Sequence, residues 1–212
     1  VRAAALFEGN TLISNNATIN TGANTIAFSG FSHSCTDNST RDLTLRISFL
    51  TTVTDNLQMS FSVTNANVTV ASSATSSQMA SFTTVNSSTT GDRNRIEVTA
   101  TKLAFQQQPS TTTINATMSP APTVRALDAN NNLDLDYVTS ISITSTGTMT
   151  GDPISSTPSS GVATFSSVVH TVAGTGYTLS ASSTGLTSAT SNAFNIVTFT
   201  YLSGDFRPKY GT

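Results

Sequence analysis

Short runs of alternating hydrophobic and polar residues recur along the chain, and clusters of Gly, Asn, Asp and Ser separate them. Successive side chains of a β-strand point to opposite faces, so this alternation predicts strands with one buried face. The cleanest run lies between residues 43 and 50, with four hydrophobic residues on one face: Leu43, Leu45, Ile47 and Phe49. No window of about eleven residues keeps a hydrophobic stripe at helical spacing. The pattern therefore predicts an all-β protein.

The predicted strands fall into two series, each long enough for one domain. In the first half they lie near residues 25–31, 43–50, 58–64, 68–70, 82 and 95–100; in the second half they lie near residues 103–105, 124–126, 138–143, 161–169, 177–181 and 194–196. About seven short strands within about 100 residues are typical of an immunoglobulin-like sandwich. We therefore expect two tandem antiparallel β-sandwiches, 1–101 and 102–197, followed by a short C-terminal extension.

The junction and the extension have distinct compositions. The run from Arg95 to Phe105 contains no Gly, Pro or Ser, so we expect a stiff connection between the two sandwiches rather than a flexible tether. The extension, 198–212, contains four aromatic residues: Phe199, Tyr201, Phe206 and Tyr210. We interpret it as the start of a further module or as a strand that docks on a neighbour.

The second half also carries a series of short motifs in a fixed order. They are ATKLAF at 100–105 followed by Gln108-Pro109, SPAPTV at 119–124, DANNN at 128–132, GVATF at 161–165, AGTGYTL at 173–179, GLTSA at 185–189 and FNI at 194–196. This series resembles the bacterial immunoglobulin-like repeats of large secreted and cell-surface adhesin-type proteins, in the style of invasin and intimin stalks, over residues 101–197. The first half resembles modules found beside such repeats in type IX-secreted surface and gliding proteins.

The resemblance implies display, spacing and adhesion at a bacterial cell surface, and no catalysis. Within it, Tyr177 looks like a tyrosine corner, whose hydroxyl bonds back to the main chain, and Gly174 and Gly176 permit the tight start of that strand. The usual Asn-Gly turn is replaced by Asn130-Asn131-Asn132. Asn tolerates the left-handed conformation, so we expect the turn to be retained.

Composition narrows the classes of partner. Charged residues make up 9% of the chain, against about 25% in typical soluble domains, and Ser and Thr fill their place, as is common in secreted proteins. Nine basic residues and a net charge of -2 argue against nucleic-acid binding. No hydrophobic run approaches the roughly 18–20 residues of a spanning helix, so membrane insertion is not expected.

The same composition favours an extracellular protein on a bacterial cell surface. The sequence does not begin with Met, and we expect it to be part of a longer polypeptide. Its expected partners are further modules of that polypeptide or neighbouring copies, and surface glycans or host surfaces.

The residues that could run catalysis are few. His33 and His170 are the two histidines, and Cys35 is the single cysteine. A Cys–His nucleophile needs an oriented imidazole, and only Asp37 stands nearby to orient His33. His170 follows a hydrophobic run, so we expect it at the surface or at a strand edge. No known catalytic motif is present, and we predict that the chain is not an enzyme.

The densest group of oxygen ligands follows the predicted strand at 124–126. Its members alternate along the chain and imitate a calcium-binding loop: Asp128, Asn130, Asn132, Asp134 and Asp136. The sixth position is Leu133 rather than Gly, and the twelfth is Thr139 rather than Glu. The group is therefore either a polar hairpin turn or a calcium site, and no other cofactor is expected.

Three alternatives remain open at this point. Lys102 could form an isopeptide bond with Asn192 or Asn195, helped by Asp128 as a buried acid. A carbohydrate-binding accessory module of a secreted enzyme would need aromatic platforms; Trp is absent, and the surface candidates are Tyr137, Tyr201 and Tyr210. A polymer subunit could add residues 198–212 as a strand to the next copy, because unpaired sheet edges accept strands.

Overall fold

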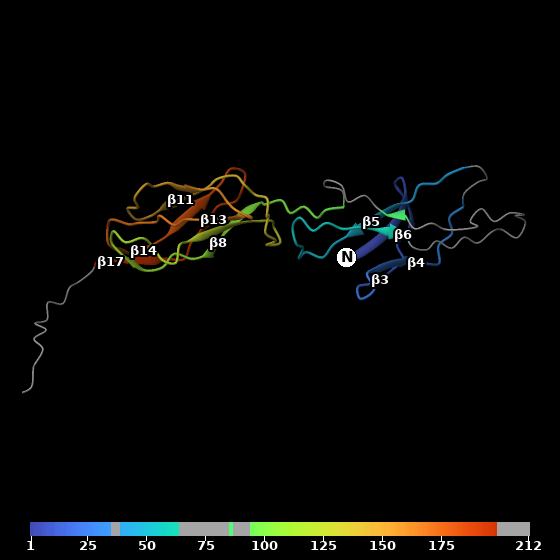
Figure 1. Ribbon diagram of the computed structural model, residues 1–212, viewed down its shortest axis with the longest axis horizontal. Coiled ribbons are helices and arrows are strands. Elements are labelled where there is room, and N and C mark those ends of the chain that lie inside the picture. Colours follow the sequence, from blue (N-terminus) through green and yellow to red (C-terminus); the bar gives the residue numbers. More distant parts are fainter. Residues whose placement is uncertain (35–38, 64–84, 87–93, 199–212) are drawn as a thin grey trace, which may run out of the picture. The chain divides into compact units, whose positions relative to one another are not determined.

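The computed structural model describes residues 1–34, 39–63, 85–86 and 94–198 (Figure 1). These residues form β-strands, turns and bends and no helix, so the predicted all-β class is confirmed for them. The described residues hold no helix that is long and apolar enough to cross a membrane. The chain divides into two compact units, Val1–Val53 and Thr54–Thr212. The boundary expected between residues 101 and 102 lies inside the second unit.

The first unit is built around a three-stranded antiparallel sheet. Strand β1 (Ala3–Glu8) lies in the middle, between β2 (Thr11–Ser14) and β5 (Thr44–Ser48). A separate hairpin joins β3 (Ala17–Asn20) to β4 (Thr25–Phe28). β4 and β5 lie within the predicted runs at 25–31 and 43–50, whereas β1, β2 and β3 were not predicted.

The run at 43–50 is buried less than its alternation predicts. Leu43 and Leu45 are 41% and 38% exposed, whereas Ile47 and Phe49 are partly buried. Among the described residues of this unit, Ala4 is the one hydrophobic residue that is fully buried. Alternation indicates which side of a strand a residue faces, but it does not show whether another layer covers that side. A second sheet over this face therefore remains a prediction.

The second unit contains a β-sandwich whose sheets are antiparallel except for one strand pair. One sheet has the order β13-β10-β8 and consists of β8 (Lys102–Gln107), β10 (Thr123–Leu127) and β13 (Val162–Thr164). A second has the order β12-β11-β15-β16 and consists of β11 (Ile141–Ser145), β12 (Ile154–Ser156), β15 (Leu179–Ser182) and β16 (Ala189–Thr190).

The last sheet of this unit contains one parallel pair. Its order is β14-β17-β9, with β9 (Thr112–Thr113), β14 (Gly174–Tyr177) and β17 (Phe194–Val197). β14 and β15 are separated by Thr178 alone and pair with β17 and β16 respectively, so residues 174–182 and 189–197 form one long interrupted hairpin. β17 and β9 run parallel.

The core of the sandwich consists of the inward residues that the alternation predicts. Seven of them have no exposed surface: Val124, Ala126, Ile141, Ile143, Val168, Leu179 and Ala181. Ala163, which the alternation did not single out, is equally buried. Phe165, Phe194 and Ile196 are also buried against them. Val138 was expected in the same strand as Ile141, and this was wrong. It lies in the turn before β11 and is 70% exposed.

The segment before β8 pairs with residues near the start of the second unit. The Asn56 amide donates to the Ile96 carbonyl at 2.9 Å, and the Ile96 amide donates to the Leu57 carbonyl at 3.0 Å. We call these paired segments, 55–59 and 94–98, the stem. A two-residue pair, β6 (Ser62–Val63) with β7 (Val85–Asn86), follows along the chain. The strands predicted near 68–70 and 82 lie outside the described residues.

Candidate metal centre

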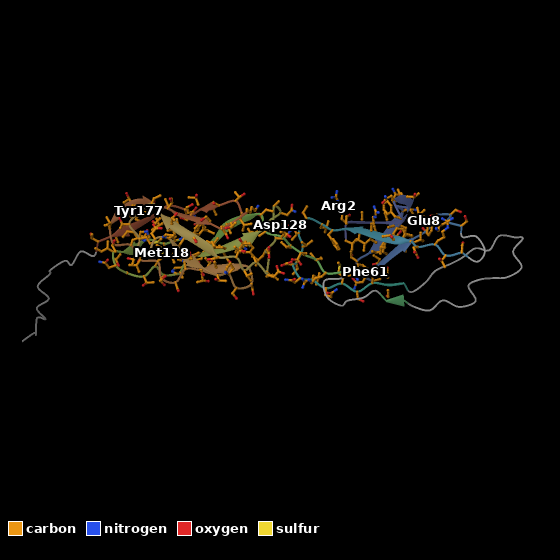
Figure 2. The ribbon with its side chains drawn as sticks, turned by 90° about the horizontal axis from the view of Figure 1, so that it is seen from above. Arg2, Glu8, Phe61, Met118, Asp128 and Tyr177 are labelled. Carbon is orange, nitrogen blue, oxygen red and sulfur yellow. The ribbon has the colours of Figure 1, made fainter. Side chains whose placement is uncertain are left out.

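The first three residues of the predicted calcium loop form a closed polar turn. Asp128 Oδ1 accepts hydrogen bonds from the amides of Asn130 and Asn132, both at 2.8 Å, and Asp128 Oδ2 accepts from Asn132 Nδ2 at 2.9 Å. Asn131 has a φ of 70°, so Asn does adopt the left-handed conformation expected here. The turn lies at one end of the sandwich, where Figure 2 labels Asp128.

These hydrogen bonds set the charge state of Asp128. Its limited burial acts to raise the pKa, but the donors from Asn132 and Asn130 and the nearby charge of Lys102 outweigh it, and the pKa is lowered. Lys102 Nζ itself donates to the Ala129 carbonyl at 3.2 Å. Both carboxylate oxygens of Asp128 therefore accept hydrogen bonds within the turn.

The last two residues of the predicted loop lie together elsewhere, beside a third carboxylate. One oxygen from each of Asp134, Asp136 and Asp55 lies within 4.8 Å of the others. Asp55 comes from the stem and was missed by sequence reasoning, because an isolated Asp so far along the chain from the loop carries no local signal. The structure thus divides the predicted site into a turn and an aspartate cluster of Asp55, Asp134 and Asp136.

Asp55 connects the stem to the sandwich through main-chain hydrogen bonds. Its Oδ1 accepts from the Val98 amide at 2.7 Å and from the Asn56 amide at 2.9 Å. Its Oδ2 accepts from the amide of Leu135, 80 residues later, at 2.7 Å. Asp55 is only 4% exposed, and these donors stabilise its buried charge.

Asp134 is the least satisfied member of the aspartate cluster. It is 5% exposed, and its Oδ2 accepts from the Ala100 amide at 2.8 Å. Its Oδ1 is buried and has no hydrogen-bond donor among the described residues. Burial raises the pKa of Asp134, and the adjoining carboxyl of Asp136 and the charge of Asp55 raise it further, against the Ala100 hydrogen bond.

Local backbone geometry fixes where Asp134 lies. Its amide donates to the Ala126 carbonyl of β10 at 3.1 Å, and the Ala126 amide donates to the Gly161 carbonyl at 3.0 Å. Gly161 has a φ of 74°, and a Cβ at this position would collide with the main-chain carbonyl of Asp134. Asp136 remains exposed at the edge of the cluster. Asp55 and Asp134 are therefore held in place by the main chain, whereas Asp136 is open to solvent.

The other candidate residues lie apart from the aspartate cluster. His170 has no exposed surface, which corrects the expectation that it lies at the surface or an edge. Its ring stacks on Tyr177 and meets Phe194 edge-on, and its Nε2 lies 2.8 Å from Ser145 Oγ. His170 lies two residues after Val168, and the sandwich buries both side chains completely. Cys35, the proposed partner of His33, lies outside the described residues.

The remaining predicted residues serve the sandwich itself. The Tyr177 hydroxyl donates to the Ala173 carbonyl at 3.4 Å, as a tyrosine corner requires, and Gly176 has a φ of 72°. Asn195 Oδ1 accepts from the Gly176 amide at 2.9 Å. Tyr137 is partly buried against the core, and its hydroxyl lies 2.7 Å from Ser183 Oγ.

None of the models of known protein families matches the sequence, and no curated protein matches it either.

Proposed function

We propose that the chain is a non-catalytic structural or adhesive module of a bacterial surface stalk, adhesin or filament, located outside the cell. The observation that carries the proposal is the parallel pairing of β9, the second strand of the sandwich along the chain, with β17, its last strand. A composition low in charge and rich in Ser and Thr also supports a secreted protein. A module of this kind must transmit tension between its two ends without unfolding.

The pair β9–β17 suits that task. Ile196 lies opposite Thr112 and Val197 opposite Thr113, and the Ile114 amide donates to the Val197 carbonyl at 3.0 Å. In a parallel pair, tension before β9 and after β17 pulls the strands in opposite directions along their length. The hydrogen bonds between them are therefore sheared together rather than opened one at a time.

We further propose that the second unit is immunoglobulin-like. The strand order supports this: β8, β10 and β13 form one sheet, as the A, B and E strands do, while β11, β15 and β16 form the other, as C, F and G do. The Tyr177 hydroxyl bonds back to the main chain at the start of the strand that corresponds to F. These two observations support the proposed likeness to an immunoglobulin-like fold.

A carbohydrate-binding role has less support. Sugar-binding surfaces usually present flat aromatic rings to solvent, yet Tyr137 and Tyr177 both pack against the sandwich core. The other candidates, Tyr201 and Tyr210, lie outside the described residues, as does the segment 199–212 that a polymer subunit would exchange.

Force spectroscopy on the full chain held by its two ends tests the proposal. Ile114→Pro removes the amide that bonds to Val197, whereas Ile114→Ala removes most of the side chain but keeps this amide. We expect Ile114→Pro to lower the unfolding force of the sandwich well below that of Ile114→Ala. Equal unfolding forces in the two variants would mean that the β9–β17 pair does not bear the load.

A further inference from the structure

The aspartate cluster carries an inference that does not depend on the proposed function. Three carboxylates, two of them buried, gather where the stem meets the sandwich. Removing charge from water costs several kcal/mol per ion unless partners compensate for it. Asp55 has such partners in main-chain amides, but Asp134 Oδ1 is buried without a donor among the described residues.

We propose that Asp55, Asp134 and Asp136 form a binding site for a divalent cation with the ligand preference of calcium. Carboxylate oxygens are the ligands that this ion prefers. A cation would supply the unsatisfied Asp134 oxygen with a partner and would neutralise the repulsion among the three charges. The exposed position of Asp136 gives an ion access from solvent and leaves room for water ligands.

The rigidity of the site favours calcium over magnesium. Calcium accepts six to eight oxygen ligands at about 2.3–2.6 Å in flexible geometry, whereas magnesium demands near-ideal octahedral geometry at about 2.0–2.1 Å. The three carboxylate oxygens lie within 4.8 Å of one another, and Asp55 and Asp134 are buried and held by main-chain amides. Calcium can therefore adapt to these fixed carboxylates more easily than magnesium.

Binding would fasten the stem to the sandwich. Asp55 belongs to the stem and holds the Val98 amide, while Asp134 follows β10 and holds the Ala100 amide just before β8. An ion shared by these carboxylates would tie together segments that are now joined by single hydrogen bonds. The competing arrangement is a proton shared between Asp134 and Asp136, with no metal involved.

A titration of the full chain separates these two arrangements. Chelator-treated protein at neutral pH is titrated with calcium chloride while the amide resonances of Val98, Ala100 and Leu135 are followed by NMR. We expect saturable shifts of these resonances with a dissociation constant on the order of 10⁻⁴–10⁻³ M, together with a rise in the thermal midpoint. Magnesium chloride should bind more weakly.

Asp136→Asn is the decisive variant, because Asp136 is the exposed member of the aspartate cluster. It should weaken calcium binding by about tenfold or more, since it removes one charged ligand. Glu97→Gln is the matched control: it makes the same charge change at an exposed neighbour of Val98, and it should alter affinity by less than about twofold. Asp128→Asn should also retain binding, because its carboxylate belongs to the turn.

Three results would overturn the proposal. They are the absence of saturable shifts up to about 10 mM calcium, an equal response to magnesium, and unchanged calcium affinity in Asp136→Asn. The first of them would favour the shared proton, the second would remove the preference for calcium, and the third would place the bound ion elsewhere. None of them bears on the force required to separate β9 from β17, so the two proposals fail independently.

Discussion

Tyr177 occupies a slot that two glycines create. A Cβ on Gly147 would lie 2.6 Å from the Tyr177 ring, and a Cβ on Gly174 would collide with its hydroxyl group. Both distances are far shorter than an ordinary van der Waals contact, so neither position can carry a larger side chain without displacing the ring. The sequence indicates Gly174 through its motif, but the role of Gly147 depends on contacts that only the folded chain reveals.

Gly174→Ala should therefore destabilise the sandwich by about 1–3 kcal/mol, the usual cost of overpacking. Tyr177→Phe removes only the exposed hydrogen bond to Ala173 and should cost less than about 1 kcal/mol. Urea unfolding of both variants, followed by tyrosine emission, provides the measurement. A Gly174→Ala protein as stable as Tyr177→Phe would show that the ring does not fill this slot.

His170 is buried as an uncharged group. Burial lowers its pKa, and the charge of Asp152 only partly opposes this effect. It packs against Tyr177 and Phe194 in the core, and its Nε2 lies within hydrogen-bond distance of Ser145 Oγ. Its Nδ1 is buried and has no hydrogen-bond partner among the described residues. The unfolded chain binds a proton on this ring more readily than the folded chain does.

The free energy of unfolding should consequently decrease as the pH is lowered through the range in which His170 takes up a proton. The loss should begin as the pH drops below about 6.5, the usual value for an unfolded histidine, and be complete below the lowered folded-state pKa. His170→Gln keeps a hydrogen-bonding group but cannot titrate, so it should flatten this part of the profile. Urea midpoints measured across that range test this, and an unchanged slope in His170→Gln would contradict it.

At the scale of elements, alternation predicted several strands of the sandwich but not β9, β12 or β16. It identified β8, β10, β11, β15 and β17 because each places its hydrophobic residues on one buried face. It misplaced Val138, which lies three residues before Ile141 and therefore does not share the alternation of Ile141 and Ile143. It overstated burial at Leu45, since a hydrophobic face predicts a covering layer without supplying one. β9 has two residues, too few to alternate.

The aspartate cluster could be predicted only in part. Asp134 and Asp136 were singled out because oxygen ligands alternate along this segment. Asp128 was grouped with them, although its position at the start of a turn favours hydrogen bonds to the amides just ahead of it. Asp55 could not be found from the sequence, because its contact with Leu135 is a product of the stem folding back on the sandwich.

At the scale of the second unit, two features join distant parts of the chain: the aspartate cluster and the sheet β14-β17-β9. Tyr177 and Asp128 lie toward opposite ends of the sandwich (Figure 2). β14, β17 and β9 form the sheet that contains Tyr177, while the aspartate cluster secures the segment that leads into β8. We infer that tension from the N-terminal side passes the aspartate cluster, which holds the Ala100 amide just before β8, before it reaches the parallel pair β9–β17.

Pulling the sandwich in two directions tests the load-bearing claim most directly. Attachment at the two chain ends shears β9 along β17, whereas attachment at the N-terminus and at Asn192→Cys, in a Cys35→Ser background, pulls both strands from the same end and separates them one bond at a time. The account predicts a clearly higher unfolding force for end-to-end pulling. Equal forces in the two directions would contradict it.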